Sequence, residues 1–295
     1  MTHNVLSPIA ASGHSLIVPF RTAGAGSPLF CFPGAGGYVD IFREMVAVLP
    51  EGQPVYGIDM ESLSDIEQRF TIEQLAPICL DLVRTIQSSG PYYFCGYSFG
   101  GLLAYEMAVQ LIQQDDGANL VALLDASNPA MLSNLSKADA AQFHKTYLTD
   151  RLKKYALQLM RGDIKAFTER GSAFIVSRLG KLFTPAIKRG FRIAGRPLPR
   201  LIRSNDPVFL NAWRSYVPKR YAKSLVVFRV EDRGPEHDRD QSMGWDTCVT
   251  EGVQVHIVPG GHVDMMSMPS VRVIAEKLAT YLDNGSNRKE FTAAL

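Results

Sequence analysis

Short apolar runs alternate with longer stretches of helical hydrophobic spacing along most of the chain. Glycine, proline and polar residues bound the apolar runs, which is typical of buried strands. These runs are Ser15–Phe20, Leu29–Pro33, Pro54–Asp59, Tyr92–Cys95, Leu120–Asp125, Ser224–Val230 and Val253–Val258. The amphipathic stretches predict helices at about Val39–Leu49, from Thr71 to about Gln87, at about Phe99–Gln113 and over Val271–Leu282. This alternation predicts an α/β fold, with a mostly parallel sheet flanked by helices on both faces.

The predicted helix after Thr71 carries a start signal and, a few residues later, a conflicting one. Thr71 and Gln74 have the spacing of a capping box, in which each side chain bonds the other's backbone N–H. Pro77 has no backbone N–H to donate inside a helix. We therefore expect this helix to begin near Pro77 or to kink there.

The stretch from about 128 to 216 departs from the alternating pattern. It contains helical stretches such as Ala140–Met160 and Ile164–Leu182 but no convincing strand. An insertion of this length between two sheet strands is usually functional, so we interpret it as a lid over the carboxyl ends of the strands. A purely structural helical subdomain is the alternative. The main domain then spans residues 15–283, with a flexible lead-in at 1–14 and a polar tail at 284–295.

The strongest chemical signal lies between a predicted strand and a predicted helix. Gly96, Ser98 and Gly100 form the pattern G-x-S-x-G at this junction, which is typical of a nucleophile elbow. The turn is so tight that side chains at the two glycine positions would collide with neighbouring backbone. The elbow would present the Ser98 hydroxyl at the start of a helix, next to free backbone N–H groups.

A serine hydroxyl needs a base, and His262 is the best-placed histidine. It follows Pro259-Gly260-Gly261 after the last predicted strand, on a loop at the sheet edge that must also carry Ser98. The other histidines are less suitable: His3 and His14 in the lead-in, His144 in the insertion, His237 in a charged run and His256 within a strand.

The base needs an acid to orient it, and Asp125 is the preferred candidate. It ends the strand after the elbow helix, so its carboxylate would lie at the same sheet edge as Ser98. The order Ser98, Asp125, His262 also matches that of α/β-hydrolases. Asp232, which ends the following strand, is the main competitor. Asp59 ends a strand on the other side of the elbow and is less suitably placed.

An oxyanion hole needs two backbone N–H donors facing the reacting carbonyl. Phe99, the residue after the nucleophile, supplies one. The loop Gly34–Gly37 follows an early strand and consists of small residues, which allow a substrate to approach the backbone closely. We expect Ala35 in this loop to supply the second donor.

Composition narrows the class of protein without defining its chemistry. The chain of 295 residues is 46% hydrophobic and 20% charged, with a net charge of +2. Its apolar runs are far shorter than the roughly 18 residues that a membrane span needs, and no secretory signal is seen. The four cysteines Cys31, Cys79, Cys95 and Cys248 form no C-x-x-C pair, so we expect free thiols, mostly buried, in a cytoplasmic protein.

Positive charge is concentrated in one part of the insertion. The segment Arg178–Arg203 contains eight Lys or Arg residues and no Asp or Glu. It could meet an acidic partner protein or a phosphate group, or it could be a solvated surface. No docking motif for nucleic acid accompanies it, and Pro185, Gly190 and Gly195 interrupt any interfacial membrane helix.

Taken together, these motifs make the chain resemble the thioesterase family of polyketide synthases, non-ribosomal peptide synthetases and fatty acid synthase. The resemblance runs from about Ser15 to Leu282. Its marks are Phe32–Gly37, Gly96–Gly101, Ala104, Glu106-Met107-Ala108, Leu124-Asp125, Tyr216-Val217-Pro218, Gly244-Trp245 and Pro259–His262. In chain-terminating members the acid follows the strand after the elbow, whereas stand-alone editing members commonly place it one strand later, where Asp232 lies.

The resemblance implies an α/β-hydrolase fold with a helical lid and a serine thioesterase activity. Ser98 would take an acyl chain from the phosphopantetheine thioester of an acyl or peptidyl carrier protein, and hydrolysis or cyclisation would release it. The chain would need no metal or redox cofactor, because the phosphopantetheine arm belongs to the partner. An acyltransferase, a generic serine esterase and a stand-alone editing thioesterase stay as alternatives. A homodimer is one option for the assembly.

Overall fold

The computed structural model describes residues 16–60, 70–133, 206–232 and 240–292. Within these ranges the chain forms one seven-stranded sheet in the order β1-β3-β2-β4-β5-β6-β7. The strands are β1 (Ile17–Arg21), β2 (Leu29–Phe32), β3 (Val55–Ile58), β4 (Tyr92–Tyr97), β5 (Ala118–Leu124), β6 (Leu225–Val230) and β7 (Val253–Val258). β1 pairs with β3 antiparallel and the other neighbours pair in parallel, so the predicted mostly parallel sheet is confirmed.

The register of the central strands brings several loops to one edge of the sheet. Tyr97, the last residue of β4, pairs with Leu124, the last residue of β5. Leu124 in turn pairs with Phe228 of β6, and Val230 pairs with Val258 at the end of β7. Because these strands run in parallel, the residues that follow them emerge close together.

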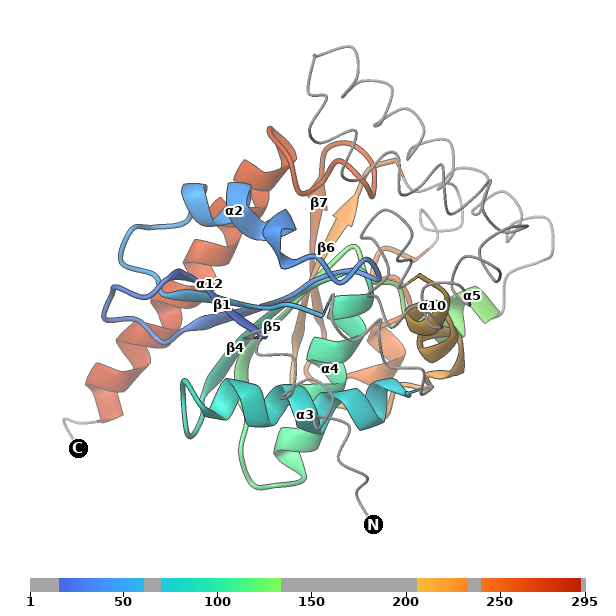
Figure 1. The fold of residues 1–295 in the computed structure, drawn as a ribbon, viewed down its shortest axis with the longest axis horizontal. Helices are drawn as coiled ribbons and strands as arrows, with labels where there is room; N and C mark the ends of the chain where they lie inside the picture. The colour runs from blue at the N-terminus through green and yellow to red at the C-terminus, as the bar shows by residue number, and fades with distance from the viewer. Residues whose placement is uncertain (1–15, 61–69, 134–205, 233–239, 293–295) are drawn as a thin grey trace, which may run out of the picture.

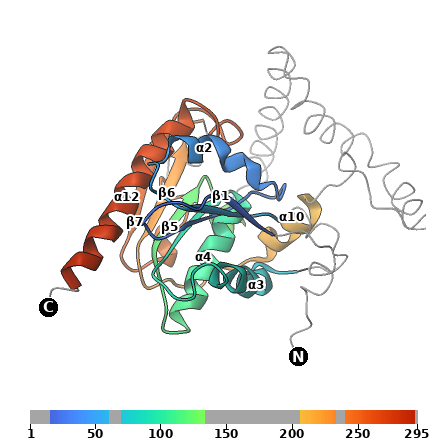
Figure 2. The same cartoon turned by 60° about the vertical axis from the view of Figure 1, so that its left-hand side comes forward.

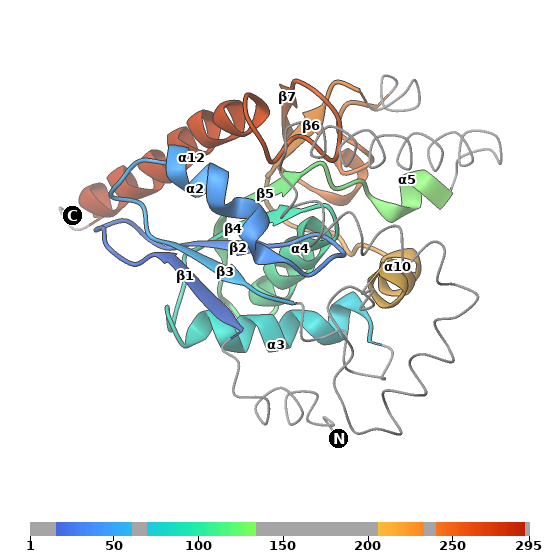
Figure 3. The ribbon, with the colours of Figure 1, turned by 45° about the horizontal axis from the view of Figure 1, so that its top comes forward.

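Helices cover both faces of the sheet, as Figures 1 and 3 show. The helices are η1 (Val39–Phe42), α2 (Arg43–Val48), α3 (Ile72–Arg84), α4 (Phe99–Ile112), α5 (Pro129–Ser133), α10 (Asp206–Ser215), η6 (Asp246–Cys248) and α12 (Ser270–Thr292). α3 and α4 pack on one face, α2 and α12 on the other. β2, β4 and β6 are buried along their whole length, which explains their apolar sequences.

The start of α3 confirms the capping box and shows how the helix tolerates its proline. Thr71 accepts from the Gln74 N–H, and the Gln74 side chain accepts from the Thr71 N–H. Pro77 lies inside α3 and cannot donate to the Glu73 carbonyl one turn earlier. The Gln110 side chain of α4 donates to that carbonyl instead, at 3.1 Å. A neighbouring helix therefore supplies the missing donor, and the helix begins at Ile72 rather than near Pro77.

α4 lies in the middle of the protein and is buried on nearly all sides. Its one buried carboxylate, Glu106, has two partners. Gln110 Nε2 donates to Glu106 Oε1 at 2.8 Å, and the Tyr216 hydroxyl donates to Glu106 Oε2 at 2.9 Å. Burial, followed by the nearby Glu106 carboxylate, raises the pKa of Tyr216. This pair links the core helix to the residue that follows α10.

Several predicted boundaries differ from the structure. The stretch Val39–Leu49 divides into η1 and α2, and the last helix continues to Thr292, well past Leu282 and into the predicted polar tail. Of the predicted lid, α5 and α10 at its two ends are described, and α10 packs beside α4 (Figure 2). The lead-in 1–14, the rest of the insertion and the basic segment Arg178–Arg203 fall outside the described residues.

Two further expectations concern the cysteines and membrane spans. The four cysteines are free, three of them buried and Cys248 partly buried. Burial raises the pKa of Cys79 to about 12 and raises that of Cys31 as well. Such thiols are poor nucleophiles at neutral pH. No helix in the described part of the chain combines the length and the apolar character needed to cross a membrane.

Candidate active site

The predicted elbow at Ser98 has the expected backbone geometry. Ser98 lies between β4 and α4 with φ 53° and ψ −116°, a left-handed conformation that non-glycine residues rarely adopt. A Cβ at Gly96 would lie 2.1 Å from the Gly100 carbonyl oxygen, and one at Gly100 would lie 2.1 Å from that of Phe32. Both neighbours are backbone atoms that cannot move aside, so both positions require glycine.

The same turn fixes Ser98 at the amino end of α4. Its N–H donates to the Leu124 carbonyl of β5 at 2.9 Å, which joins the elbow to the neighbouring strand end. Its hydroxyl does not cap the helix. A serine at this position faces the positive end of the helix dipole, which favours negative charge developing on a bound substrate.

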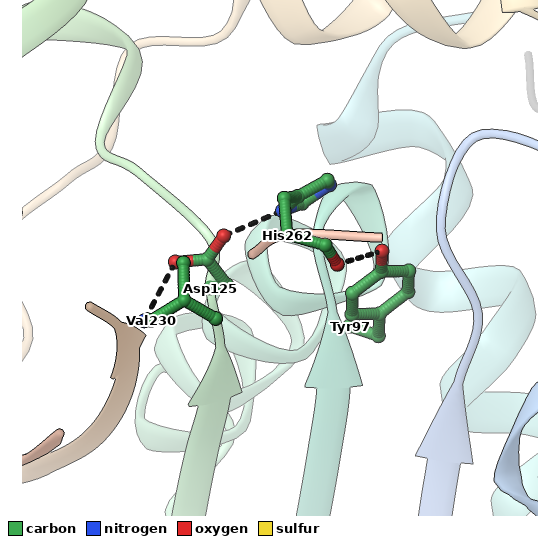
Figure 4. A network of polar contacts seen from close by, with 4 residues as sticks. All are labelled: Tyr97, Asp125, Val230 and His262. Carbon is green, nitrogen blue, oxygen red and sulfur yellow. Dashed lines mark hydrogen bonds and ion pairs between the residues drawn. The ribbon is translucent and has the colours of Figure 1, made fainter. Parts of the chain in front are cut away.

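The carboxylate of Asp125 and the imidazole of His262 form the central contact of the site (Figure 4). His262 Nδ1 lies 2.5 Å from Asp125 Oδ2. The Asp125 side chain is fully buried, while that of His262 is 17% exposed. Because a carboxylate accepts hydrogen bonds, we assign the proton to Nδ1, which leaves the lone pair of the neutral ring on Nε2.

Backbone groups hold the Asp125 carboxylate and main chain. The Val230 N–H donates to Asp125 Oδ1 at 3.3 Å, so each carboxylate oxygen has a partner. The Asp125 N–H donates to the Phe228 carbonyl at 2.7 Å. Asp125 itself has φ 49°, a second left-handed residue at this edge of the sheet. Hydrogen bonds with β6 therefore hold both the backbone and the carboxylate of Asp125.

The segment after Asp125 is held by the turn that contains Gly244 and Trp245. Trp245 is fully buried and its Nε1–H donates to the Ala126 carbonyl at 2.7 Å. Asn128 donates from its backbone to the Met243 carbonyl at 3.0 Å and from its side chain to that of Gly244 at 2.8 Å. The Gly244-Trp245 mark noted in the sequence thus holds the segment that follows Asp125, a role that its local pattern does not reveal.

Tyr97 contacts His262 twice and was not singled out from the sequence. Its hydroxyl donates to the His262 carbonyl at 2.7 Å. Its ring stacks on the imidazole, with 5.1 Å between centroids and 22° between planes. Since Tyr97 precedes Ser98, the dipeptide that carries the serine also contacts the histidine. In the sequence, Tyr97 is the variable residue between Gly96 and Ser98 in the G-x-S-x-G pattern, and only this position could have drawn attention to it.

The loop Gly34–Gly37 lies against the elbow, as the oxyanion-hole prediction requires. A Cβ at Gly34 would lie 3.2 Å from the Tyr97 ring and 3.5 Å from Ser98 Cβ. The loop is closed by the Gly37 N–H, which donates to the Gly34 carbonyl at 2.9 Å. Within the described ranges, the N–H groups of Ala35 and Phe99 donate to no other backbone carbonyl. Their assignment as oxyanion donors stays a prediction.

The competing acids lie elsewhere. Asp232 is exposed, and its N–H donates to the Gly260 carbonyl at 3.2 Å. Asp59 follows β3 on the other side of the elbow, where its N–H donates to the Leu16 carbonyl. Nδ1 of His262 is occupied by Asp125. The described residues include no hydrogen bond from the Ser98 hydroxyl to the imidazole, a contact that is often long before substrate binds.

Of the remaining histidines, one lies on a strand and four fall outside the described residues. His256 lies on β7, where its Nε2 is 2.6 Å from the Tyr281 hydroxyl of α12, as expected of a strand-face residue. His3, His14, His144 and His237 fall outside the described residues. In the part of the chain that the structure describes, no group of three or more His, Cys, Asp or Glu side chains could hold a metal ion.

A parallel sheet with a serine elbow after a central strand, and an Asp–His pair at the adjoining strand ends, defines an α/β-hydrolase. Residues 27–281 match the family model of the thioesterase domain. The chain belongs to this thioesterase domain family.

Curated relatives are much longer than this chain. A non-reducing polyketide synthase of Pseudevernia furfuracea is 26% identical over 284 residues, which cover 91% of this chain and 13% of the synthase. Malpibaldin synthetase of Mortierella alpina is 33% identical over 273 residues, or 91% of this chain and 4% of the synthetase. The chain is therefore similar to one small part of each large enzyme.

Solved structures share the fold of this chain. The NocB thioesterase domain, solved as a covalent complex with a fluorophosphonate nocardicin G analogue, aligns with a TM-score of 0.62 at 18% identity. The alignment covers 91% of this chain and 100% of that one. A four-domain nonribosomal peptide synthetase aligns with a TM-score of 0.66 at 21% identity, covering 93% of this chain and 21% of that one.

Proposed function

We propose that this domain releases an acyl or peptidyl chain from the phosphopantetheine thioester of a carrier protein, through an acyl intermediate on Ser98. The observation that carries the proposal is the 2.5 Å contact between His262 and Asp125, held beside the elbow that bears Ser98. The family and the synthases among its relatives support the thioester class of substrate.

The first half of the reaction forms the acyl-enzyme. Ser98 Oγ attacks the thioester carbonyl carbon while its proton passes to His262 Nε2. The carbon–sulfur bond then breaks, and the imidazolium returns the proton to the departing pantetheine sulfur, which leaves as a free thiol. Asp125 keeps its negative charge throughout. It orients the ring through Nδ1 and stabilises the imidazolium that forms between the two proton transfers.

The second half releases the chain. Water, or a hydroxyl or amine of the chain itself, attacks the acyl-serine ester and gives its proton to His262 Nε2. When the ester bond breaks, the same proton returns to Ser98 Oγ and regenerates the enzyme. Water yields a free acid, and an internal nucleophile yields a ring. No metal or redox cofactor takes part in either half of this proposed reaction.

The backbone donors stabilise the negative oxygen that forms in each half. We assign these donors to the N–H groups of Phe99 and Ala35. The position of the Gly34–Gly37 loop against Ser98 supports this assignment. Loss of one such donor commonly costs about 2.7–4 kcal/mol of transition-state stabilisation.

The occupied acid position favours a chain-terminating enzyme over a stand-alone editing one. By the resemblance described above, editing members commonly place the acid where Asp232 lies, and here Asp125 contacts the imidazole. The carrier protein is the proposed partner. A role of the basic segment Arg178–Arg203 in meeting that carrier, and a homodimer, stay predictions.

The test compares thioester and oxygen-ester substrates. We expect free acid or ring product from acyl chains loaded on a carrier protein, and much slower turnover of the matching simple oxygen esters. A generic esterase would turn over both at similar rates, and an acyltransferase would require an added acceptor. Wild-type protein that releases nothing from a broad panel of acyl carriers would overturn the proposal.

A further inference from the structure

Tyr97 is placed to act on the proposed base without touching substrate. We infer that Tyr97 is a positioning residue that holds His262 at a fixed place relative to Ser98. This inference rests on the proposed function, since it assigns His262 the role of general base. It concerns the variable residue of the elbow, which has no chemical role in the mechanism above.

The loop that carries His262 is held at several points along its length. Pro259 is held by the Ser270 hydroxyl, which donates to its carbonyl at 2.7 Å, and Gly260 accepts from the Asp232 N–H. At His262 the Tyr97 hydroxyl, on the central strand β4, donates to the backbone carbonyl oxygen at 2.7 Å. Tyr97 thus ties the base's main chain to β4.

The ring of Tyr97 adds a second constraint, this time on the imidazole. The near-parallel stack covers one face of the ring and opposes rotation about its side-chain bonds. Asp125 fixes the Nδ1 edge. With carbonyl, ring face and Nδ1 each engaged (Figure 4), the position of Nε2 follows from contacts to two adjacent strand ends.

Tyr97 can position His262 relative to Ser98 because Tyr97 and Ser98 are neighbours in the chain. The backbone turns at Ser98, which has a positive φ, directly after the residue whose hydroxyl and ring contact His262. Nucleophile and base are therefore positioned through a single peptide unit. Catalysis is sensitive to such placement, because a misplacement of about 1 Å can cost about a hundredfold in rate.

Two variants separate the two contacts that Tyr97 makes with His262. Tyr97→Phe keeps the ring and removes the hydroxyl, and one lost hydrogen bond should lower kcat about three- to tenfold. Tyr97→Leu removes both contacts and should lower kcat about a hundredfold. In both, KM should stay within about twofold, because Tyr97 does not contact the carrier or acyl chain in this proposal.

Tyr93→Phe is the matched control. Tyr93 lies four residues earlier on β4, is buried in the same core cluster, and has a hydroxyl that accepts from Asn119 Nδ2 at 3.3 Å. Its substitution removes a comparable hydroxyl on the same strand without touching His262. We expect unchanged kcat for this variant, with any effect confined to the thermal unfolding midpoint.

The second readout is the rate at which a fluorophosphonate inactivates the enzyme. This reaction requires activated Ser98 but neither carrier nor acyl chain. Matching slowdowns in kcat and in inactivation for both Tyr97 variants, with Tyr93→Phe at the wild-type rate, would support the inference. Wild-type inactivation rates in folded Tyr97→Phe and Tyr97→Leu would overturn it. Absence of carrier thioesterase activity in the wild type would instead count against the proposed function, and the inactivation rates would still decide the role of Tyr97.

Discussion

The Tyr216 hydroxyl donates to the buried Glu106 carboxylate at 2.9 Å, across 110 positions of the chain. Glu106 lies in the middle of α4, and Tyr216 directly follows α10 at the end of the insertion. The helix that begins at the elbow is therefore bonded to the base of the insertion. α10 also contacts the elbow through Phe209, whose ring packs edge-on against that of Phe99 with 4.8 Å between the ring centroids.

Tyr216→Phe tests the energy of this pair. The substitution leaves a buried carboxylate oxygen without its donor, which should lower the free energy of unfolding by about 1–3 kcal/mol. Urea unfolding of the wild type and variant measures the loss. Tyr221→Phe is the control and should change it by no more than about 0.5 kcal/mol. Tyr221 is equally buried, but its hydroxyl bonds no other described residue. Equal losses in both variants would argue against a special role for Glu106.

Gly100→Ala tests the close packing at the elbow. The added Cβ would meet the Phe32 carbonyl, a backbone atom of β2, so we expect a loss of about 3 kcal/mol or more in stability. Gly52→Ala provides the control because nothing lies within 4 Å of its Cβ and its φ is not positive. Thermal unfolding of both variants makes the comparison. A stable Gly100→Ala protein would show that the turn is looser than described.

Asp125→Asn tests the choice of acid. The neutral amide has no negative charge to stabilise an imidazolium, and its NH2 group can donate to Nδ1 and favour the wrong tautomer of the ring. We therefore expect kcat to fall by about 10⁴-fold while the fold is retained. Asp232→Asn should stay within about twofold of the wild type, since this exposed side chain does not occupy Nδ1 of His262. Steady-state kinetics on one acyl carrier measures both. The reverse ranking would reassign the acid to Asp232.

His256 should contribute to the pH dependence of stability. Burial, and then the nearby positive charge of Lys277, lower the pKa of His256 below its ordinary value. As pH falls through about 6.5, the unfolded chain binds the proton before the folded protein does, so folding loses free energy. His256→Gln should therefore show a smaller decrease in unfolding free energy between about pH 7 and pH 5. Identical slopes for the two proteins would contradict this assignment.

Local patterns predicted much of the fold and the candidate site. The capping box of Thr71 and Gln74, the elbow glycines and the apolar strands all depend on neighbours in sequence. The placement of Asp125 beside His262 followed from a general rule, since parallel strands end at one edge of a sheet. The sequence order favoured Asp125 over Asp232, but both end adjacent parallel strands, so only the structure could show that Asp125 contacts His262.

Contacts between distant segments were beyond such patterns. The stacking of Tyr97 on His262 and the bond from Trp245 to Ala126 depend on the relative placement of loops. The tolerance of α3 for Pro77 depends on Gln110, a side chain of another helix. In each case the partner lies far away in sequence, so the local sequence pattern does not indicate the contact.

Detection of an acyl group on Ser98 tests the proposed reaction most directly. Wild-type protein is mixed with acyl-loaded carrier protein, quenched rapidly in acid, and measured by intact mass and peptide mapping. We expect a transient mass increase equal to the acyl group on the peptide containing Ser98. We expect no increase in Ser98→Ala, which should also release no product. Release of the chain by Ser98→Ala at the wild-type rate, or an acyl group found on a different residue, would contradict the proposed reaction.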